Sequence, residues 1–411
     1  MEDDAKKSVE PRLRFPELAE GWTTKPLKQF AKPLKERAGT SVCVPYTVNT
    51  GVGLVSQQEK FGRIIAGDSF KNYIVLKRND FAYNKSATKA FPEGFLARHV
   101  NDERAAVPNS IFTCFRINDD VVEPAYLDFL FQANLHGKWL RKFIMVGARA
   151  HGSLAVDDDD LMALPVPLPE GPKSLAEQQK IADCLTSVDV VIAAQGRKVA
   201  ALQDHKKGLM QQLFPREGDS LPGLRFPEFR DGPEWKVKPL SIISENLNNR
   251  RVPITENVRL RGNIPYYGAS GVVDYVEGHI FDEDLLCVSE DGANLVARTY
   301  PIAFPISGKT WVNNHAHVLR FEEHATQKLV EGYLNSTDLK DFITGIAQPK
   351  LNRAMLDSIP IPLPEPAEQK AIAGCISSLD SLLAAELEKL DALGKHKKGL
   401  MQQLFPSSEG D

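Results

Sequence analysis

Basic and amide side chains gather in the predicted loops of this chain of 411 residues, and they are of the types that recognise the edges of nucleic-acid bases. Arg and Lys pair with guanine, whereas Asn and Gln pair with adenine through two hydrogen bonds. The candidates are Asn84, Lys85, Ser86, Arg149, His151, Arg250, Arg251, Arg259, Arg261, Tyr267, Asn313, Asn314, His315, Gln348, Lys350 and Asn352. Any one of them is more often a solvated loop charge or a packing side chain, so only their clustering in both halves favours base contact.

No catalytic motif is visible. The sequence lacks GxxxxGK[ST], GxSxG and the Asp/Asn-Pro-Pro-aromatic tetrapeptide of amino-methyltransferases. The acidic run at residues 157–160 is better suited to capping a helix or a turn than to holding a metal. His315 and His317 would share one face of a strand, and a strand-edge role is favoured there over a metal pair. We therefore expect a binding protein that carries no metal and no cofactor.

The chain is a tandem repeat. The segment HKKGLMQQLFP occurs at residues 205–215 and again, letter for letter, at 396–406. Two further blocks recur in the same order, namely LRFPE followed by Trp and KPL, and the proline-rich LPVPLPE or IPIPLPE. Between these blocks lie two segments that look unlike each other. The repeated blocks are called frames below, and the two dissimilar segments are called inserts.

Each frame predicts one long helix. Apolar residues in 181–213 and 372–404 recur every three and four positions, which is the heptad pattern of a coiled coil. Prolines precede both stretches and end them at Pro215 and Pro406. A helix of about 55 Å, at 1.5 Å per residue, needs a partner for its apolar stripe, and the other copy is the obvious one.

A local two-fold axis would make the two helices antiparallel, so that their midpoints meet. The polar residues Gln195 and Glu386 interrupt the seam at those midpoints and are predicted to fix its register. Parallel packing, or docking of each helix on its own insert, are the alternatives. Antiparallel rods would hold the two inserts tens of Å apart, which suits two sites on one long ligand such as DNA.

The inserts are predicted to be mixed α/β globules with many loops. Their β-rich runs are residues 73–84, 110–117, 285–291 and 315–321, and helical stretches follow near 124–143 and 326–342. The predicted fold class is α+β, with two such domains separated by two long helices in a pseudo-two-fold repeat. The predicted segments are residues 1–170, 171–215, 216–365 and 366–411.

Composition places limits on the protein's class. No apolar run approaches the length of a membrane span, no signal peptide is evident, and five scattered cysteines are typical of a reduced cytoplasmic protein. The net charge of −4 is unusual for a nucleic-acid binder that acts alone. A DNA-binding role would therefore require localised basic residues or a basic partner.

The repeated LRFPE, IPLP, EQ…IA.C and HKKGLMQQLFP blocks resemble those of the specificity subunit of type I restriction–modification systems, over nearly the whole chain. GIAQPKLN at residues 345–352 and NNHAHVL at 313–319 look like recurrent elements of its target-recognition domains. The first insert has VGARAHGSL at residues 146–154 instead, so the roles of Gln348 and Lys350 do not transfer directly to Arg149.

The resemblance implies a scaffold without catalytic activity. Each recognition domain would read one half of a bipartite double-stranded DNA target, and the coiled coil would set the spacer. Two methyltransferase subunits would dock on the scaffold, and restriction subunits would add a translocase and nuclease. S-adenosylmethionine, ATP and Mg²⁺ are expected on those partner subunits, not on this chain.

The two identical helix ends would then offer two equivalent docking surfaces. We predict partner contacts at His205, Lys206, Lys207, His396, Lys397 and Lys398. The alternative is that the segment is repeated for packing alone. Two other functions stay open from the sequence: a coiled-coil adaptor that binds only proteins, and a self-contained nuclease.

Overall fold

The structure is a computed structural model that describes residues 10–18, 21–49, 51–144, 154–216, 218–345 and 347–406. Its contacts divide the chain into two units. The first unit comprises Met1–Ala194 and Leu390–Asp411, and the second comprises Gln195–Lys389. Each unit therefore contains one insert and a stretch of each long helix.

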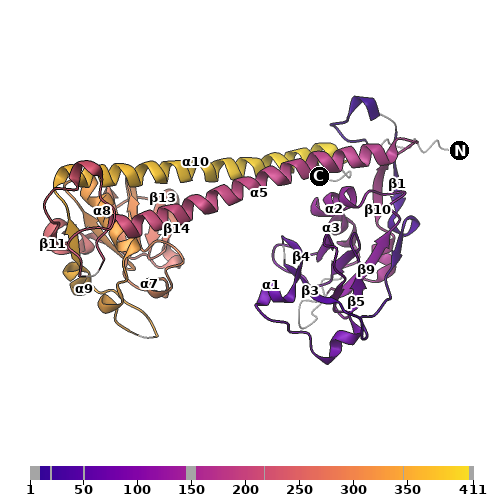
Figure 1. The fold of residues 1–411 in the computed structure, drawn as a ribbon, viewed down its shortest axis with the longest axis horizontal. Coiled ribbons are helices and arrows are strands. Elements are labelled where there is room, and N and C mark those ends of the chain that lie inside the picture. The colour runs from indigo at the N-terminus through magenta and orange to yellow at the C-terminus, as the bar shows by residue number, and fades with distance from the viewer. Residues whose placement is uncertain are drawn as a thin grey trace. The chain divides into compact units, whose positions relative to one another are not determined.

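The two frames form single unbroken helices, α5 (Ser174–Leu213) and α10 (Pro366–Leu404). Proline is favoured at the first position of a helix, where its missing N–H costs nothing, and α10 begins in this way at Pro366. In the second unit, α5 and α10 are antiparallel, because Gln195 contacts Glu386 and Lys206, further along α5, contacts the earlier Asp380. The predicted antiparallel pairing is confirmed, and Figure 1 shows the two helices within each unit.

The proline-rich blocks are extended, as predicted, but they also form strands that the sequence did not reveal. In the first unit, β1 (Trp22–Pro26) pairs antiparallel with β10 (Pro165–Pro169). In the second unit, β11 (Lys236–Pro239) pairs in the same way with β20 (Pro360–Leu363). Proline cannot donate to a sheet, so these segments suit a two-stranded ladder in which every strand is an edge.

Each insert is built on two four-stranded sheets. In the first unit, one sheet has the order β2 (Ala31–Pro33), β9 (Phe112–Ile117), β6 (Phe81–Asn84) and β7 (Phe95–Arg98). The other has the order β4 (Gly53–Ser56), β3 (Val44–Asn49), β8 (Ala105–Val107) and β5 (Ile74–Leu76). All neighbours are antiparallel except β3 and β8, which are parallel.

The second unit repeats this topology strand for strand. One sheet has the order β12 (Glu245–Asn246), β19 (Ala316–Arg320), β16 (Leu285–Ser289) and β17 (Ala303–Ile306). The other has the order β14 (Gly271–Val276), β13 (Arg261–Gly268), β18 (Lys309–Val312) and β15 (Phe281–Asp282), and again only one pair, β13 with β18, is parallel. The two inserts thus look unlike each other in sequence but share one fold.

Shorter helices cover the sheets. In the first unit these are α1 (Gln57–Phe61), α2 (Pro124–Gln132), α3 (Leu135–Leu140) and α4 (Asp158–Met162). In the second they are α6 (Leu240–Ile243), α7 (Asn294–Ala297), α8 (His324–Ser336) and α9 (Arg353–Ser358). The predicted stretch at residues 124–143 contains α2 and α3, and that at 326–342 contains most of α8.

Each repeated helix end is buried in a core. Met401, Leu404 and Phe405 join the main core of the first unit together with Ile181 and Leu185 of α5. The equivalent residues Met210, Leu213 and Phe214 join the main core of the second unit together with Ile372 and Ile376 of α10. The two ends also make the same aromatic contact, Phe405 with Tyr126 and Phe214 with Tyr333, at 5.6 Å between ring centroids in both cases.

Two general features of the chain follow from the described residues. None of the described helices is long and apolar enough to cross a membrane. All five cysteines are free thiols, and burial raises the pKa of Cys114 and Cys287 strongly. A thiol with a raised pKa is a poor nucleophile, so these two behave as core residues.

Candidate nucleic-acid interface

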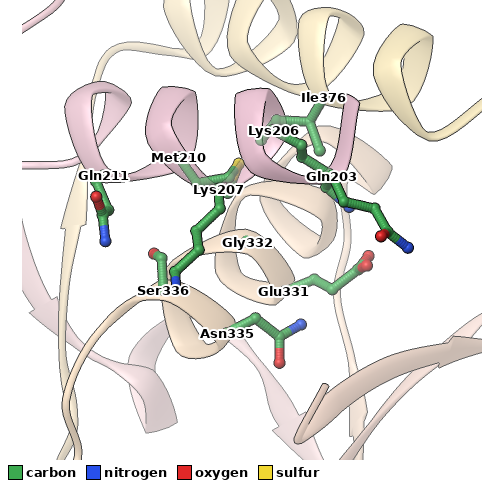
Figure 2. A pocket seen from close by; sticks show the side chains of 10 residues that line it. All are labelled: Gln203, Lys206, Lys207, Met210, Gln211, Glu331, Gly332, Asn335, Ser336 and Ile376. Carbon is green, nitrogen blue, oxygen red and sulfur yellow. The ribbon is translucent and has the colours of Figure 1, made fainter. Parts of the chain in front are cut away.

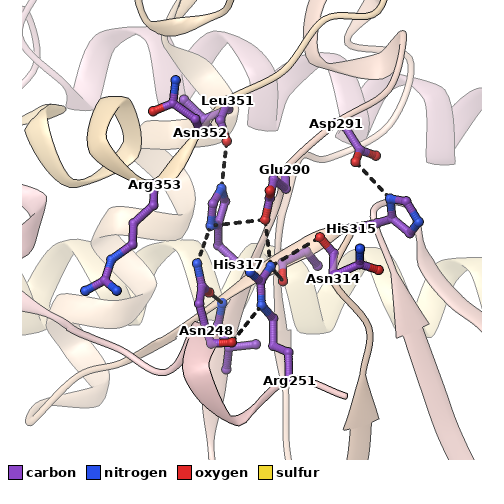
Figure 3. Close-up of polar contacts among 12 residues, drawn as sticks. Asn248, Arg251, Glu290, Asp291, Asn314, His315, His317, Leu351, Asn352 and Arg353 are labelled. Carbon is purple, nitrogen blue, oxygen red and sulfur yellow. Dashed lines mark hydrogen bonds and ion pairs between the residues drawn. The ribbon is translucent and has the colours of Figure 1, made fainter. Parts of the chain in front are cut away.

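Two of the predicted loops meet at one edge of the second unit, and Asp291 joins them. The backbone of Asp291 forms a β-bridge with Lys350, and its carboxylate lies 2.8 Å from Nδ1 of His315 (Figure 3). Gly292 reinforces the junction, because its N–H donates to the carbonyl of Pro349. The loop with Asn314 and His315 and the loop with Gln348 and Lys350 therefore lie side by side.

The buried His317 stabilises this edge through hydrogen bonds to two neighbouring segments. Nε2 of His317 lies 2.7 Å from the carbonyl of Leu351, and its Nδ1 lies 2.7 Å from the amide nitrogen of Asn248. A carbonyl can only accept, so Nε2 carries the proton and Nδ1 accepts from Asn248. Burial lowers the pKa of His317, which keeps the imidazole neutral. His317 is therefore a buried structural residue of β19 (Ala316–Arg320).

Arg251 also stabilises this edge. Its guanidinium lies 2.7 Å from the Glu290 carboxylate and donates to the carbonyls of Asn314 and Ala316, and it is largely buried. Burial alone would raise the pKa of Glu290, but its bonds to Arg251 and Lys350 lower it. The carboxylate is therefore charged and forms an ion pair that fixes the position of Arg251.

Other predicted residues also have partners within the chain. Asn352 caps α9 by accepting from the N–H of Met355, and the side chain of Asn313 accepts from the N–H of His315. Asn314, His315, Gln348 and Lys350 are the exposed members of this edge. These four side chains, together with Asp291, are defined here as the reading edge.

The remaining basic candidates of the second unit lie outside the reading edge. Arg250 pairs with Glu283 and lies over the ring of Phe281, and Arg259 pairs with Asp274 and lies over Tyr266. Arg261 is exposed on β13. Tyr267, for which stacking on a base and packing were both open, is half-buried and stacks on Phe304 at 6.0 Å.

In the first unit the structure describes three of the five predicted DNA-binding residues, namely Asn84, Lys85 and Ser86. Asn84 accepts from the N–H of Ser86, and Nζ of Lys85 lies 3.4 Å from the carboxylate of Asp158. Asp158 also accepts from the hydroxyl of Thr113 and is the first residue of α4. The acidic run thus lies at the start of a helix, but Asp157 at the N-cap position makes no side-chain capping hydrogen bond. Among the described residues no group of acidic, histidine or cysteine side chains could hold a metal. Arg149 and His151 lie outside the described residues.

The repeated segment places its lysines in two different settings. Lys206 pairs with Asp380, and Lys397 lies 2.7 Å from Asp189, so the first lysine of each copy bridges to the opposite long helix. The second lysine and the histidine of each copy are exposed, namely Lys207, His205, Lys398 and His396. Of the six predicted docking residues, these four have a free surface position, whereas Lys206 and Lys397 hold the helices together.

Gln195 and Glu386 meet, as their positions at the midpoints predicted. The amide nitrogen of Gln195 donates to the Glu386 carboxylate at 2.6 Å and to its carbonyl at 2.9 Å. The side chain of Lys198 also bonds to this carboxylate, and both bonds lower the pKa of Glu386. Whether the pair sets the register of the helices stays a prediction.

Each repeated end borders a cavity. The cavity of the second unit measures about 240 Å³ and lies between α5 and α8 (Figure 2). It is lined by Gln203, Lys206, Lys207, Met210, Gln211, Glu331, Gly332, Asn335, Ser336 and Ile376. The first unit has a larger cavity, about 770 Å³, beside the equivalent residues Lys397, Lys398, Met401 and Gln402.

Sequence reasoning missed Asp291 of the reading edge and Glu290 beside it. The two are the last residues of the predicted β-rich run 285–291 and directly follow β16 in the structure, so their position at a strand end was the available signal. It also missed Ser270 and Tyr300, which are exposed and whose hydroxyls lie 3.0 Å apart.

The two units share one fold, and each contains a stretch of both long helices. This arrangement is typical of a tandem protein with two binding domains. The sequence pattern of the "Type I restriction modification DNA specificity domain" matches residues 233–393. The MjaVIII specificity subunit of a type I restriction enzyme from Methanocaldococcus jannaschii is 25% identical over 65% of this chain and 67% of its own length. The chain is also 36% identical to a Haemophilus influenzae protein described as type I restriction enzyme specificity subunit S.HindORF215P, over 37% of this chain and 39% of that protein.

Solved structures agree on the fold. A type I restriction–modification S subunit from M. genitalium superposes with a TM-score of 0.55 at 14% identity, covering 97% of this chain and all of that one. A chain from a study of assembly and conformational transition of a type I R-M system gives 0.58 at 16% identity, with the same coverage. Over nearly its whole length the chain is similar to a type I restriction enzyme specificity subunit, MjaX of Methanocaldococcus jannaschii, with 25% identity over 95% of this chain.

Proposed function

We propose that this chain is the specificity subunit of a type I restriction–modification system and that it reads a bipartite DNA target, one half with each unit. The observation that carries the proposal is the shared topology of two inserts with dissimilar sequences. A common frame with different loop residues is what two readers of different base sequences need, because base contacts depend on side chains whereas docking depends on the frame.

The reading edge supplies the chemistry for the second half of the target. His315 and Asn314 can each donate to or accept from base edges in the major groove, and Gln348 and Lys350 add an amide and a cation. Arg251, Glu290 and His317 hold these loops in place before DNA arrives. A pre-organised edge loses little conformational entropy on binding, which favours affinity.

We propose further that the chain is not catalytic and that two methyltransferase subunits dock on it. The exposed His205 and Lys207, and the equivalent His396 and Lys398, are available for equivalent contacts with two copies of a partner. S-adenosylmethionine would be bound by those subunits, and ATP and Mg²⁺ by restriction subunits where these join the complex. The net charge of −4 is consistent with phosphate neutralisation shared among subunits.

The test is to map methylated adenines in cells that express this chain with its methyltransferase subunit. The expected result is a split motif with a fixed gap. Exchange of residues 22–165 for the insert of another family member should change one half of the motif and leave the other half and the gap intact. Changes in both halves would contradict one reader per unit.

Two other functions are tested with the purified chain. Cleavage of DNA by the chain alone in the presence of Mg²⁺ would make it a nuclease and would exclude the scaffold. A coiled-coil adaptor predicts that the complex with methyltransferase binds matched and scrambled DNA equally. The scaffold predicts selective binding that weakens with salt, because ions compete with the protein for phosphates.

A further inference from the structure

The segment between α7 and β17 in the second unit holds an exposed tyrosine in a fixed position. Asn294 is 7% exposed, and its side chain is used entirely on this segment. Its Oδ1 accepts from the N–H groups of Thr299 and Tyr300 and from the hydroxyl of Thr299, while its Nδ2 donates to the carbonyl of Tyr300. Four bonds from one buried amide make Tyr300 part of a rigid turn, although the residue is 43% exposed.

The turn also contains a strained residue. Arg298 has a φ of +50°, in the left-handed region that a long side chain rarely adopts. Its guanidinium donates to the carbonyls of Leu334 and Thr337 at the end of α8 and to that of Leu295, so the strain is held by three bonds. Backbone strain that the surroundings hold in place is concentrated at functional sites.

Tyr300 lies beside the reading edge. Its hydroxyl is 3.0 Å from the hydroxyl of Ser270, at the turn between β13 and β14. Ser289 joins that turn to the edge, because its hydroxyl donates to the carbonyl of Ala269 and its backbone pairs with Ala316, next to His315. The turn that carries Ser270 therefore lies close to the strand end that carries His315.

We propose that Ser270 and Tyr300 form a positioning pair that binds one phosphate of the DNA backbone at the second half-site. This rests on the proposed function. When one hydroxyl donates to the other, one O–H remains free to donate outward, and Ser and Tyr hydroxyls are common donors to DNA phosphates. Such a contact carries no sequence information, but it fixes the register in which the reading edge meets the bases.

The charge pairs at the reading edge favour uncharged donors for the phosphate contact. Lys350 lies 3.2 Å from Glu290 and His315 lies 2.8 Å from Asp291, so both side chains already have carboxylate partners. Hydroxyl donors can approach a phosphate without disturbing these pairs. The rigid turn then presents them at little entropic cost.

The experiment measures affinity of the complex with its methyltransferase subunit for a duplex that contains the full target. Tyr300→Phe keeps the ring and removes the donor, and we expect about a tenfold loss, as for one hydrogen bond to a charged group. The loss should be equal for duplexes with a matched and a scrambled second half-site. Ser270→Ala should behave alike, and the double variant should lose little more than either single one.

Methylphosphonate substitution identifies the phosphate. Neutralising one phosphate at the second half-site should weaken the wild-type complex and leave Tyr300→Phe unaffected. The matched control is Tyr275→Phe, which alters an exposed tyrosine on β14 and should bind as the wild type does. Wild-type affinity in Tyr300→Phe, an equal loss in Tyr275→Phe, or a loss restricted to the matched duplex would overturn the pair. A wild-type complex that lacks selectivity would instead overturn the proposed function itself.

Discussion

Lys397 and Asp189 stand on the two long helices, and Nζ of the lysine lies 2.7 Å from the carboxylate of the aspartate. The second copy makes the same pair, Lys206 with Asp380, at the positions equivalent by the 191-residue repeat. The lysine that interrupts each apolar seam is therefore matched by an aspartate of the opposite helix. These pairs are partly buried in the seam, and they disfavour alternative registers, in which the lysine would lose its partner.

Exchange of the charges tests this pair. Asp189→Lys alone should lower the free energy of unfolding of the first unit by about 1 kcal/mol, because it places two cations side by side. Combining it with Lys397→Asp should recover most of the loss. Chemical denaturation of the four members of the cycle provides the measurement. Asp391→Lys, at an exposed pair with Lys395, serves as a control with little effect, and strictly additive losses at 189 and 397 would contradict direct coupling.

Truncation of the repeated phenylalanine should loosen the unit in which it packs. Phe405→Ala removes a buried ring that contacts Tyr126, and we expect a loss of about 3 kcal/mol. Hydrogen exchange should then rise in α2 and leave α8 unchanged, whereas Phe214→Ala should do the reverse. Gln402→Ala, an exposed change in the same segment, should leave both protected; equal loosening of both units by Phe405→Ala would count against separate cores.

Arg225 and Glu368 form a buried pair that joins the LRFPE block to the start of α10. The guanidinium bonds both carboxylate oxygens at 2.8 Å, and both side chains are nearly inaccessible. Glu368→Ala should cost about 3 kcal/mol, since it leaves an unpaired buried cation. Thermal unfolding measures the loss. Glu365→Ala breaks the exposed pair with Lys236 and should cost almost nothing, so comparable losses would refute the role of burial.

The stability of the first unit should fall in mild acid because of His136. Burial against Tyr83 and Phe131 lowers the pKa of His136 from 6.5 to about 4. The folded state keeps the imidazole neutral while the unfolded chain takes up a proton below pH 6.5, so unfolding is favoured as the pH falls from 6.5 towards 4. The full contribution is roughly 3 kcal/mol.

Variants separate this effect from other titrations. His136→Phe should flatten the dependence of the melting temperature on pH between 7 and 5, whereas His396→Ala, at an exposed site, should keep the wild-type slope. An unchanged slope in His136→Phe would assign the acid sensitivity to other groups.

The reading edge predicts an effect confined to one half of the DNA target. His315→Ala or Gln348→Ala in the methyltransferase complex should weaken binding to the matched target by about tenfold and lower discrimination at the second half-site. Competition with duplexes altered in either half measures this. His279→Ala, an exposed histidine away from the edge, is the control. Lost discrimination at the first half would contradict the assignment.

The helices could be predicted from the sequence because their signals are local. Heptad spacing and bracketing prolines lie within about forty residues, and the meeting of Gln195 with Glu386 follows from the symmetry of the repeat. The common sheet topology could not be predicted, because strands such as β16 and β19 pair across some thirty residues of dissimilar sequence.

The site was predicted only in part for a similar reason. His315 and Gln348 belong to loops that meet, as their clustering suggested, but Arg251 depends on Glu290, which stands 39 residues away. A loop arginine with a buried carboxylate partner has the same sequence signature as one that faces DNA. The partner, and not the residue type, decides its role.

The ladders β1–β10 and β11–β20 have one more consequence. Trp22 stands opposite Pro169, and Lys236 opposite Leu363, so the polypeptide enters and leaves each globule at neighbouring points. Any foreign segment whose own ends lie close together can be accommodated between them without disturbing the surrounding architecture. New sequence preferences can therefore arise by wholesale replacement through recombination, a far larger evolutionary step than the accumulation of point mutations.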